Sequence, residues 1–299
     1  MKHKKGKNIN GWLIIDKPKD MGSTQVVSIT RHLFDAKKNG HAGTLDPFAT
    51  GVLPIAFGEA TKLIDFVMNG PKEYEFTIRF GFETNTGDCT GEKTNSSEKL
   101  PSLEQIQSTI PHFIGKIKQT PPAFSAIKIN GNRAYDLARK GIEVDIKERE
   151  IEIFDLKLLN FEKDSAKFIT SCSKGTYIRS LGQDIAKKMG CYGHITELQR
   201  TKCGIFTSKD TILLDNLKNM VYIAQTLLPL ETSLRDIAVM AVSEVEATKL
   251  KQGQSISPKG KTDLPAGSAI AAAICDRVLI AIVRIEETKI SPIRVFNLT

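Results

Sequence analysis

Residues 40–62 read GHAGTLDPFATGVLPIAFGEATK, and the first half of this stretch has the composition of a binding loop. Its three glycines allow the backbone to approach a ligand closely. His41 and Asp46 are the only side chains in that half that can exchange a proton near neutral pH. Asp followed by Pro is also a common turn opening, because Pro suits the second turn position. The residues alone therefore leave a site and a plain surface turn equally open.

The sequence on either side of this stretch predicts short strands and helices. Gly11-Trp-Leu-Ile-Ile reads as a short buried strand, and a helix is expected from Ser23 to about Phe34. Residues 72–80 alternate, so that their aromatic and aliphatic side chains share one face, as a half-buried strand requires. These side chains are Tyr74, Phe76, Ile78 and Phe80. On pattern alone they are core residues.

The middle and the end of the chain carry clear helix starts. Ser102-Leu-Glu-Gln and Ser243-Glu-Val-Glu are capping boxes, and their helices are expected to end near Ile110 and Lys251. A helical stripe, which Gly190 is placed to end, consists of Ile178, Leu181, Ile185 and Met189. Strands are expected over 151–161, 166–172, 269–274 and 278–285.

Helices and strands mix without a regular βαβ rhythm, which favours an α+β architecture over a doubly wound sheet. A chain of 299 residues is long enough for one large domain and one small domain. We expect the large domain over residues 1–235 and the small one over 238–299, beginning near Ala238.

The positive charge lies in the larger part of the chain. The net charge is +8, and residues 236–299 hold 8 basic and 7 acidic residues, which leaves 34 basic and 27 acidic residues, or +7, before them. A positive field attracts polyanions and gives affinity for nucleic acid that does not depend on sequence. Four lysines among the first seven residues predict a solvated tail more strongly than an RNA-binding arm.

Several function classes lack their sequence motifs. The chain has no G-x-G-x-x-G, no G-x-S-x-G and no H-E-x-x-H, and Pro258-Lys-Gly-Lys-Thr lacks the leading glycine of a phosphate-binding loop. Five cysteines without a C-x-x-C pair support neither a zinc site nor a disulfide framework, so we expect no metal and a reducing, cytoplasmic location. The sequence contains no apolar run of about 18 residues, so no membrane-spanning helix is predicted.

Residues 40–62 resemble the signature of the TruB family of tRNA pseudouridine-55 synthases. Further motifs follow in the family's order, over about residues 11–206: Asp16-Lys-Pro, Lys72-Glu-Tyr74, Thr84-Asn-Thr-Gly-Asp88, Pro121-Pro-Ala-Phe-Ser-Ala-Ile-Lys-Ile-Asn-Gly131, Cys172-Ser-Lys-Gly-Thr-Tyr-Ile-Arg179 and Leu198-Gln-Arg-Thr. The sequence after Ala238 is similar, more weakly, to the family's PUA-type RNA-binding domain. The resemblance implies a mixed, mainly antiparallel catalytic domain of pseudouridine-synthase type and a small C-terminal PUA-like β domain.

The resemblance also implies a role for each matching residue. Asp46 would be the catalytic aspartate, and Arg179 would pair with it. The other implied substrate-binding residues are His41, which would displace or hold the target base, Tyr74, which would stack on it, Tyr177, which would line the pocket, and Leu198. The expected RNA-contact candidates are Lys17, Lys62, Lys128 and Arg133. The expected substrate is the T-arm of tRNA, with no cofactor and no obligatory protein partner.

The chain departs from the family's pattern at a few positions. Asn85 stands where the family usually has Asp, Gln199 replaces a common Arg, and Tyr192-Gly-His194 replaces a turn of small residues. These departures concern contacts with the RNA backbone and leave the expected catalytic residues intact.

The residue types suit the reaction that the family performs. Pseudouridine formation breaks the N1–C1′ bond of uridine, turns the base and joins C5 to C1′, which needs a carboxylate at the sugar. Asp46 could act as nucleophile or as base, and Arg179 would lower the pKa of Asp46 by favouring its charged form. The base must first be flipped out, and stacking on Tyr74 would offset part of that cost, by about 1–3 kcal/mol.

Two other functions remain open at this point. One is a related pseudouridine synthase that acts on another RNA, as in guide-directed complexes. The other is an RNA-binding or RNA-folding protein in which catalysis is secondary. The intact set of Asp46, Tyr74, Tyr177 and Arg179 argues against a purely binding role.

Overall fold

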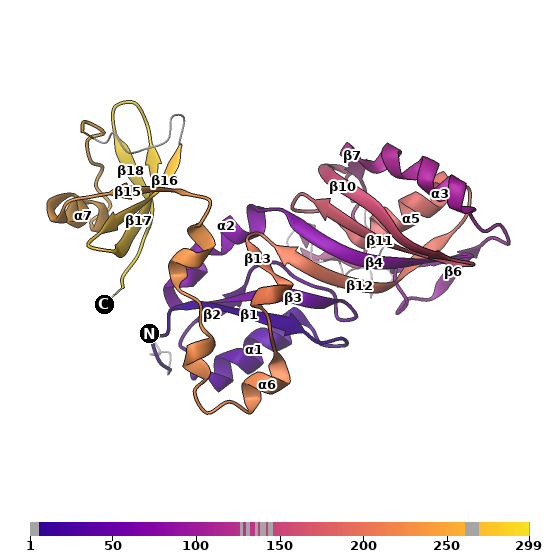
Figure 1. Cartoon of the computed structure of the whole chain (residues 1–299), viewed down its shortest axis with the longest axis horizontal. Coiled ribbons are helices and arrows are strands. Elements are labelled where there is room, and N and C mark those ends of the chain that lie inside the picture. Colours follow the sequence, from indigo (N-terminus) through magenta and orange to yellow (C-terminus); the bar gives the residue numbers. More distant parts are fainter. Residues whose placement is uncertain are drawn as a thin grey trace.

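A long, mainly antiparallel sheet runs through the larger part of the chain (Figure 1). The computed structural model describes residues 6–125, 128–129, 132–134, 137, 142, 146–260 and 269–298. Within them the main sheet has the strand order β14-β1-β3-β12-β4-β11-β10-β7, with β13 paired to β12 and β2 paired to β3. The strands are β1 Gly11–Lys17, β2 Asn39–His41, β3 Thr50–Phe57, β4 Lys72–Phe80, β7 Gly115–Gln119, β10 Arg149–Glu162, β11 Ser165–Cys172, β12 Gly193–Cys203, β13 Phe206–Thr207 and β14 Ile212–Leu213. The predicted mixed, mainly antiparallel fold is confirmed.

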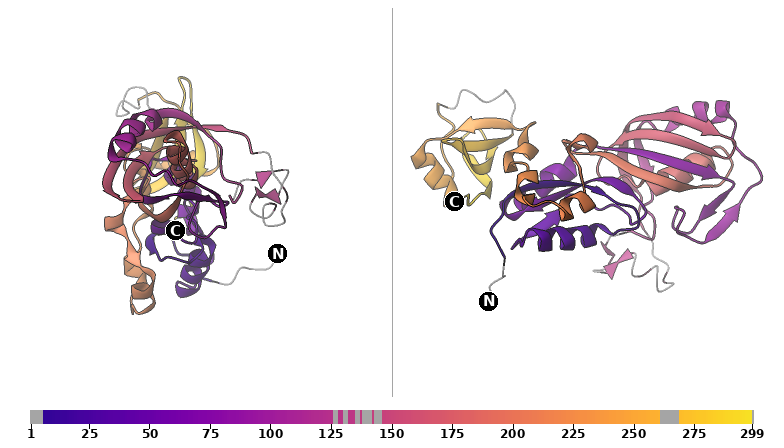
Figure 2. Two further views of the ribbon diagram at one scale, coloured as in Figure 1. Left: turned by 90° about the vertical axis from the view of Figure 1, so that its right-hand side faces the viewer. Right: turned by 60° about the horizontal axis from the view of Figure 1, so that its bottom comes forward.

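Helices cover the sheet and short hairpins extend from it. The helices are α1 Ser23–Leu33, α2 Ile64–Asn69, α3 Leu103–Thr109, α5 Ile178–Lys188, α6 Leu214–Lys218 and α7 Glu244–Lys251, and η1 Gly58–Leu63 and η5 Leu230–Leu234 are 3-10 turns. The hairpins are β5 Phe82–Thr84 with β6 Lys93–Ser96, and β8 Lys128–Ile129 with β9 Asn132–Arg133. Figure 2 shows α1 lying against the strands β1 to β3. No helix among these residues is long and apolar enough to cross a membrane.

The two halves of the main sheet meet at β12. This strand pairs antiparallel with β4 along its length, but it pairs with β3 only where Gln199 faces Thr50 and Arg200 faces Gly51. That contact is parallel, whereas β3 and its neighbour β1 are antiparallel. Residues 50–57 therefore reach the middle of the sheet, where β12 separates them from β4.

The core confirms the predicted strand and helix faces. Phe76 and Ile78 of β4 are fully buried, and the ring of Phe76 stacks on Phe168 of β11 with centroids 5.4 Å apart. The stripe on α5 is buried against β12 and β4. A Cβ on Gly182 would lie 2.5 Å from Cδ1 of Ile195, so this glycine allows α5 to approach the sheet closely.

The predicted helix starts are also confirmed, but several strands were not predicted, among them β3 and β12 of the main sheet and the last strand of the small sheet. Ser102 and Ser243 both form capping boxes, at the starts of α3 and α7. A four-stranded sheet, in the order β15-β16-β17-β18, comprises Ala238–Ala241, Ile270–Cys275, Val278–Ile285 and Ile290–Val295. Its last strand contains Pro292, which argues against a central strand, and β18 accordingly lies at the sheet edge with a register shift beside Pro292.

A set of contacts that we call the clasp joins the small sheet to the larger part of the chain. Glu59 and Lys62, on η1, hold backbone atoms at the end of β18 and just after it: Lys62 Nζ donates to the carbonyl of Val295 at 2.7 Å, and Glu59 Oε2 accepts from the amide of Asn297 at 2.8 Å. Between them Phe296 is buried in an apolar cluster that also contains Trp12. The small sheet thus lies at one end of the molecule, near α2 (Figure 1).

Candidate active site

The loop between β2 and β3 carries Asp46, and bonds from two other elements hold it. The carbonyl of Asp46 accepts from the amide three residues later at 3.1 Å, which is the turn expected at Asp-Pro. Ser23, at the start of α1, bonds both the amide and the carbonyl of Leu45. Lys17, at the end of β1, donates to the carbonyl of Pro47 at 3.0 Å. The carboxyl of Asp46 is therefore presented by a fixed turn.

Arg179 binds Asp46 through a fork of two hydrogen bonds. Its Nε and Nη2 donate to Oδ2 and Oδ1 of Asp46 at 2.8 and 3.1 Å. The same guanidinium donates to the carbonyls of Thr86 and Phe124 at 2.8 and 2.9 Å, so its direction is fixed by three segments of the chain. The side chain of Arg179 is 4% exposed, whereas that of Asp46 is 33% exposed and reachable from solvent. The expected pairing of the two residues is present.

A second carboxylate, that of Asp88, also faces Arg179. Its Oδ2 lies 3.7 Å from Nε of Arg179, and its Oδ1 accepts from the hydroxyl of Thr86 at 2.8 Å and the amide of Thr90 at 2.9 Å. Asp88 is buried. Residues 84–88 match a family motif, but nothing in their spacing places Asp88 beside Arg179, so no role was predicted for Asp88. Asn85 closes the same turn by accepting from the amide of Glu92.

The pKa of Asp46 is raised overall, although Arg179 alone would lower it. Burial raises the pKa of Asp46 from the ordinary value of 3.8, and Asp88 adds to the rise, while Arg179 and Lys17 oppose it. The predicted lowering by Arg179 is thus one contribution to the pKa, and the loss of hydration outweighs it. An Arg fork of this kind binds the carboxylate form.

Tyr74 and His41 lie on two different strands of the main sheet, β4 and β2. Tyr74 of β4 is half-buried and faces Arg200 of β12 in the sheet register. Burial raises the pKa of Tyr74 to about 12, so the phenol keeps its proton at neutral pH. His41 ends β2, and its Nδ1 is buried without a hydrogen-bond partner in the described parts of the chain. Burial, and then the charge of Arg200, lower the pKa of His41, which favours the neutral ring.

Tyr177 is set just before the first turn of α5, two residues from Arg179. Its amide and carbonyl are bonded to the side chain of Gln119 at 2.8 and 3.1 Å. The guanidinium of Arg149 lies 4.8 Å from the centroid of its ring. The backbone of Tyr177 is therefore fixed by β7, and the ring by β10.

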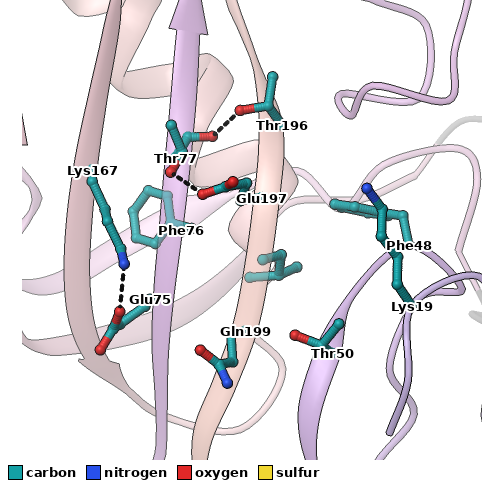
Figure 3. Close-up of a pocket in the computed structure, with 11 residues that line it drawn as sticks. Lys19, Phe48, Thr50, Glu75, Phe76, Thr77, Lys167, Thr196, Glu197 and Gln199 are labelled. Atoms are coloured by element: carbon teal, nitrogen blue, oxygen red, sulfur yellow. Dashed lines mark hydrogen bonds and ion pairs between the residues drawn. The ribbon is translucent and has the colours of Figure 1, made fainter. Parts of the chain in front are cut away.

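Leu198 lines a cavity of about 230 Å³ at the junction of the two sheet halves. Figure 3 shows Phe48 and Thr50, just after Asp46, facing residues of β4 and β12 across it. The walls carry bonded polar groups: Lys167 pairs with Glu75 at 2.8 Å, and the hydroxyl of Thr77 donates to Glu197 at 3.0 Å. Asp46 and Arg179 do not line this cavity, but Phe48, two residues after Asp46, does.

The four expected RNA-contact candidates differ in whether the structure leaves their side chains available to RNA. The prediction for Lys17 is wrong, because Lys17 is 0% exposed and its Nζ donates to the carbonyls of Pro18, Met21 and Pro47. Lys62 is engaged in the clasp. Lys128 and Arg133 face each other across the β8–β9 hairpin, and their side chains lie outside the described residues.

Where the structure is described, no group of three or more His, Cys, Asp or Glu side chains could hold a metal ion. The candidate site consists of Asp46 with the two hydrogen bonds from Arg179, the rings of Tyr74, Tyr177 and His41, and Leu198 beside the cavity.

Comparisons with known proteins identify the family of the chain. The model described as "TruB family pseudouridylate synthase (N terminal domain)" matches residues 31–178, and "tRNA pseudouridylate synthase B C-terminal domain" matches residues 179–237. The chain is 44% identical over 308 residues to the tRNA pseudouridine synthase B of Caulobacter vibrioides, covering 100% of this chain and 99% of that protein. It is also 44% identical over 302 residues to the protein of that name from Bradyrhizobium diazoefficiens, covering 98% and 87%.

Solved structures share the fold at lower identity. One is titled "Structure of H/ACA RNP bound to a substrate RNA containing 2'-deoxyuridine", with a TM-score of 0.74, 22% identity, and coverage of 96% of this chain and 85% of that chain. Another is titled "Crystal Structure of a Cbf5-Nop10-Gar1 Complex", with a TM-score of 0.74, 24% identity, and coverage of 97% and 84%. These similarities extend over both the main sheet and the small one.

Proposed function

The chain belongs to the TruB family of pseudouridylate synthases, and we propose that it converts uridine 55 in the T-loop of tRNA to pseudouridine with Asp46 as the catalytic residue. It is a tRNA pseudouridine synthase like its full-length relatives. The observation that carries the catalytic assignment is the fork from Arg179, which holds one carboxylate, partly exposed, on the loop of the family's signature.

The reaction requires no net oxidation or hydrolysis. The N1–C1′ bond breaks, the uracil turns, C5 bonds to C1′, and the proton on C5 leaves while N1 gains one. Asp46 acts on the sugar side of the base, either by attack on C1′ or by removal of a sugar proton. Both roles use the carboxylate form, which Arg179 binds through two hydrogen bonds.

The aromatic residues hold the flipped base. Tyr74 stacks on it, which supplies about 1–3 kcal/mol toward the cost of unstacking. Because the pKa of Tyr74 is raised to about 12, its phenol is poorly suited to accept the proton from C5. His41 presents a neutral imidazole, and Tyr177 and Leu198 bound the base pocket.

The small sheet supports a second proposal, about domains. We assign residues 1–235 to the catalytic domain and residues 238–299 to a PUA-like domain that contacts the tRNA outside the T-loop. The clasp supports this, because it fixes the small sheet relative to the loop of Asp46. No protein partner is needed for this arrangement, and free cysteines such as Cys172 and Cys203 fit a cytoplasmic location.

The decisive experiment is base-resolved detection of pseudouridine in an unmodified tRNA transcript, incubated with this protein alone. Pseudouridine is expected at position 55, and a transcript with cytidine at that position is expected to gain none elsewhere. Modification at another uridine would overturn the T-loop assignment. A requirement for an added guide RNA would instead place the chain with guide-directed enzymes.

A further inference from the structure

Arg200 of β12 is a buried cation without a carboxylate. It is 1% exposed, and no carboxylate of the described ranges lies within ion-pair distance of it. Its Nε donates to the carbonyl of Val52 at 2.8 Å, and its Nη2 donates to the carbonyl of Gly43 at 3.0 Å. A buried charge that is bonded only to neutral groups is costly to fold around, which raises the question of what it contributes.

The two carbonyls lie on either side of Asp46: that of Gly43 near the start of the loop, and that of Val52 in β3, just after the loop ends. Gly43 lies three residues before Asp46, and Val52 lies six residues after it. Arg200 therefore connects the two segments on either side of Asp46 through its two hydrogen bonds, an arrangement that we call the bracket. In the register of the sheet it also faces Gly51 on one side and Tyr74 on the other, so it connects the loop to the stacking ring.

Two glycines make room for this bracket. A Cβ on Gly51 would lie 2.3 Å from the carbonyl oxygen of Arg200, and a Cβ on Gly43 would lie 3.3 Å from its Nη1. Both glycines have a positive φ, of +98° and +102°. The signature loop is thus shaped around the backbone and the side chain of Arg200.

Lys72 shows what a purely structural cation looks like in the same sheet. It is also buried, and its Nζ donates to the carbonyls of Met68 and Gly70 at the end of α2. Those carbonyls flank no reacting group. The partners of Arg200, in contrast, flank Asp46, and its charge acts on both His41 and Tyr74.

We propose that Arg200 is a positioning residue for pseudouridine formation: it fixes the segments on either side of Asp46 and sets the loop between them against Tyr74. This inference rests on the proposed role of Asp46. Arg200 does not touch the reacting atoms, so it acts through geometry, and a misplacement of about 1 Å can lower a rate about 100-fold.

The test uses the full-length chain with Arg200→Met, which removes both the charge and the fork, and Arg200→Lys, which keeps the charge and only part of the fork. Arg79→Met is the matched control, since Arg79 lies in the same sheet but forms an exposed ion pair with Asp164. Melting temperature, tRNA affinity and the single-turnover rate at saturating tRNA are measured for each. A structural role alone would lower stability and leave that rate unchanged.

Arg200→Met is expected to bind tRNA within about threefold of wild type and to react at least about 100-fold more slowly. Arg200→Lys should recover part of that rate, and Arg79→Met all of it. A folded Arg200→Met within threefold of the wild-type rate would overturn the proposal, as would unfolding of both Arg200 variants. Inactivity of the wild type on tRNA would count against the proposed function itself, whereas an active wild type with active Arg200 variants would remove only this inference.

Discussion

At the scale of single residues, the site depends on one guanidinium shared by two carboxylates. Arg179 bonds Asp46 through two nitrogens and faces Asp88 at 3.7 Å, while two carbonyls fix its orientation. Such a cation cannot follow a moving carboxylate, so the position of Asp46 is set before substrate arrives. Preorganised charge of this kind is a main source of enzymatic rate enhancement.

Replacement of Asp46 by Asn tests the catalytic assignment. Asn keeps the size and turn-forming ability of Asp but removes the carboxylate. The rate should fall by at least about 10⁴-fold, the upper range of general acid–base effects, while tRNA affinity changes little because phosphate contacts and stacking remain. Circular dichroism, tRNA binding and single-turnover pseudouridine formation on one preparation measure this. A folded, binding variant with turnover within tenfold of wild type would show that Asp46 serves only the turn.

The pH dependence of the rate follows from the pKa of Asp46. The carboxylate is the active form, so the rate is present above this pKa and is lost as pH falls through it. Because burial raises the pKa of Asp46 from 3.8, the acid limb of the single-turnover rate should lie above that value. Arg179→Lys should move the limb to higher pH, since it loses the fork that lowers the pKa. A limb below 3.8, or one that Arg179→Lys moves downward, would contradict this.

The sequence predicted the residues that match family motifs better than their partners. Asp46 and its pairing with Arg179 followed from the resemblance, and the turn at Asp46 followed from the residues themselves. The positions of Asp88 and Arg200 depend on strands and loops that lie 91 and 148 residues from their contacts, and no local pattern encodes such distances. Lys17 was misread for the same reason: a lysine in a loop motif looks exposed until three carbonyls are found around it.

At the scale of elements, the junction between β3 and β12 is the tightest point of the site. The two strands share only two register pairs, and one of them is Arg200 with Gly51. Secondary structure was predicted well where periodicity or capping was strong, as in β4, α3 and α5. It was missed in β3 and β12, which form this junction, and in β18, where Pro292 interrupts the strand pattern at an edge that tolerates proline.

Gly51→Ala should destabilise the fold more than a change of backbone conformation alone explains. Its φ of +98° makes any Cβ unfavourable, by about 1–2 kcal/mol, and the oxygen of Arg200 stands 2.3 Å from that Cβ. Gly115→Ala is the control, because Gly115 has a similar φ of +96° and nothing within 4 Å. Urea unfolding should show a larger loss for Gly51→Ala. Equal losses would mean that the junction yields to the extra atom without cost.

At the scale of the whole molecule, the clasp makes the small sheet part of the architecture of the site. Glu59 and Lys62 belong to the same signature stretch as Asp46, yet their side chains hold backbone atoms near residue 296. Residues at the end of the signature stretch therefore orient the small sheet, whereas Asp46, in its first half, is the proposed catalytic residue.

Phe296→Ala tests how far stability depends on this contact. Phe296 is 1% exposed in a cluster shared with the main sheet, so its loss should cost about 3–5 kcal/mol and weaken the affinity for full-length tRNA. Tyr222→Ala is the matched control, because Tyr222 is an aromatic residue that is 70% exposed. Denaturant unfolding and tRNA binding are measured for both. Similar behaviour of the two variants would show that the small sheet is only loosely attached.

The cluster around Phe296 also bears on how the protein is made. Trp12 packs in that cluster, so a residue synthesised among the first dozen waits for one synthesised near position 296 before its surroundings are complete. During translation the apolar surface beside η1 therefore stays uncovered until nearly the whole chain has been synthesised. Chaperone binding should therefore concentrate on this surface until the last strand leaves the ribosome.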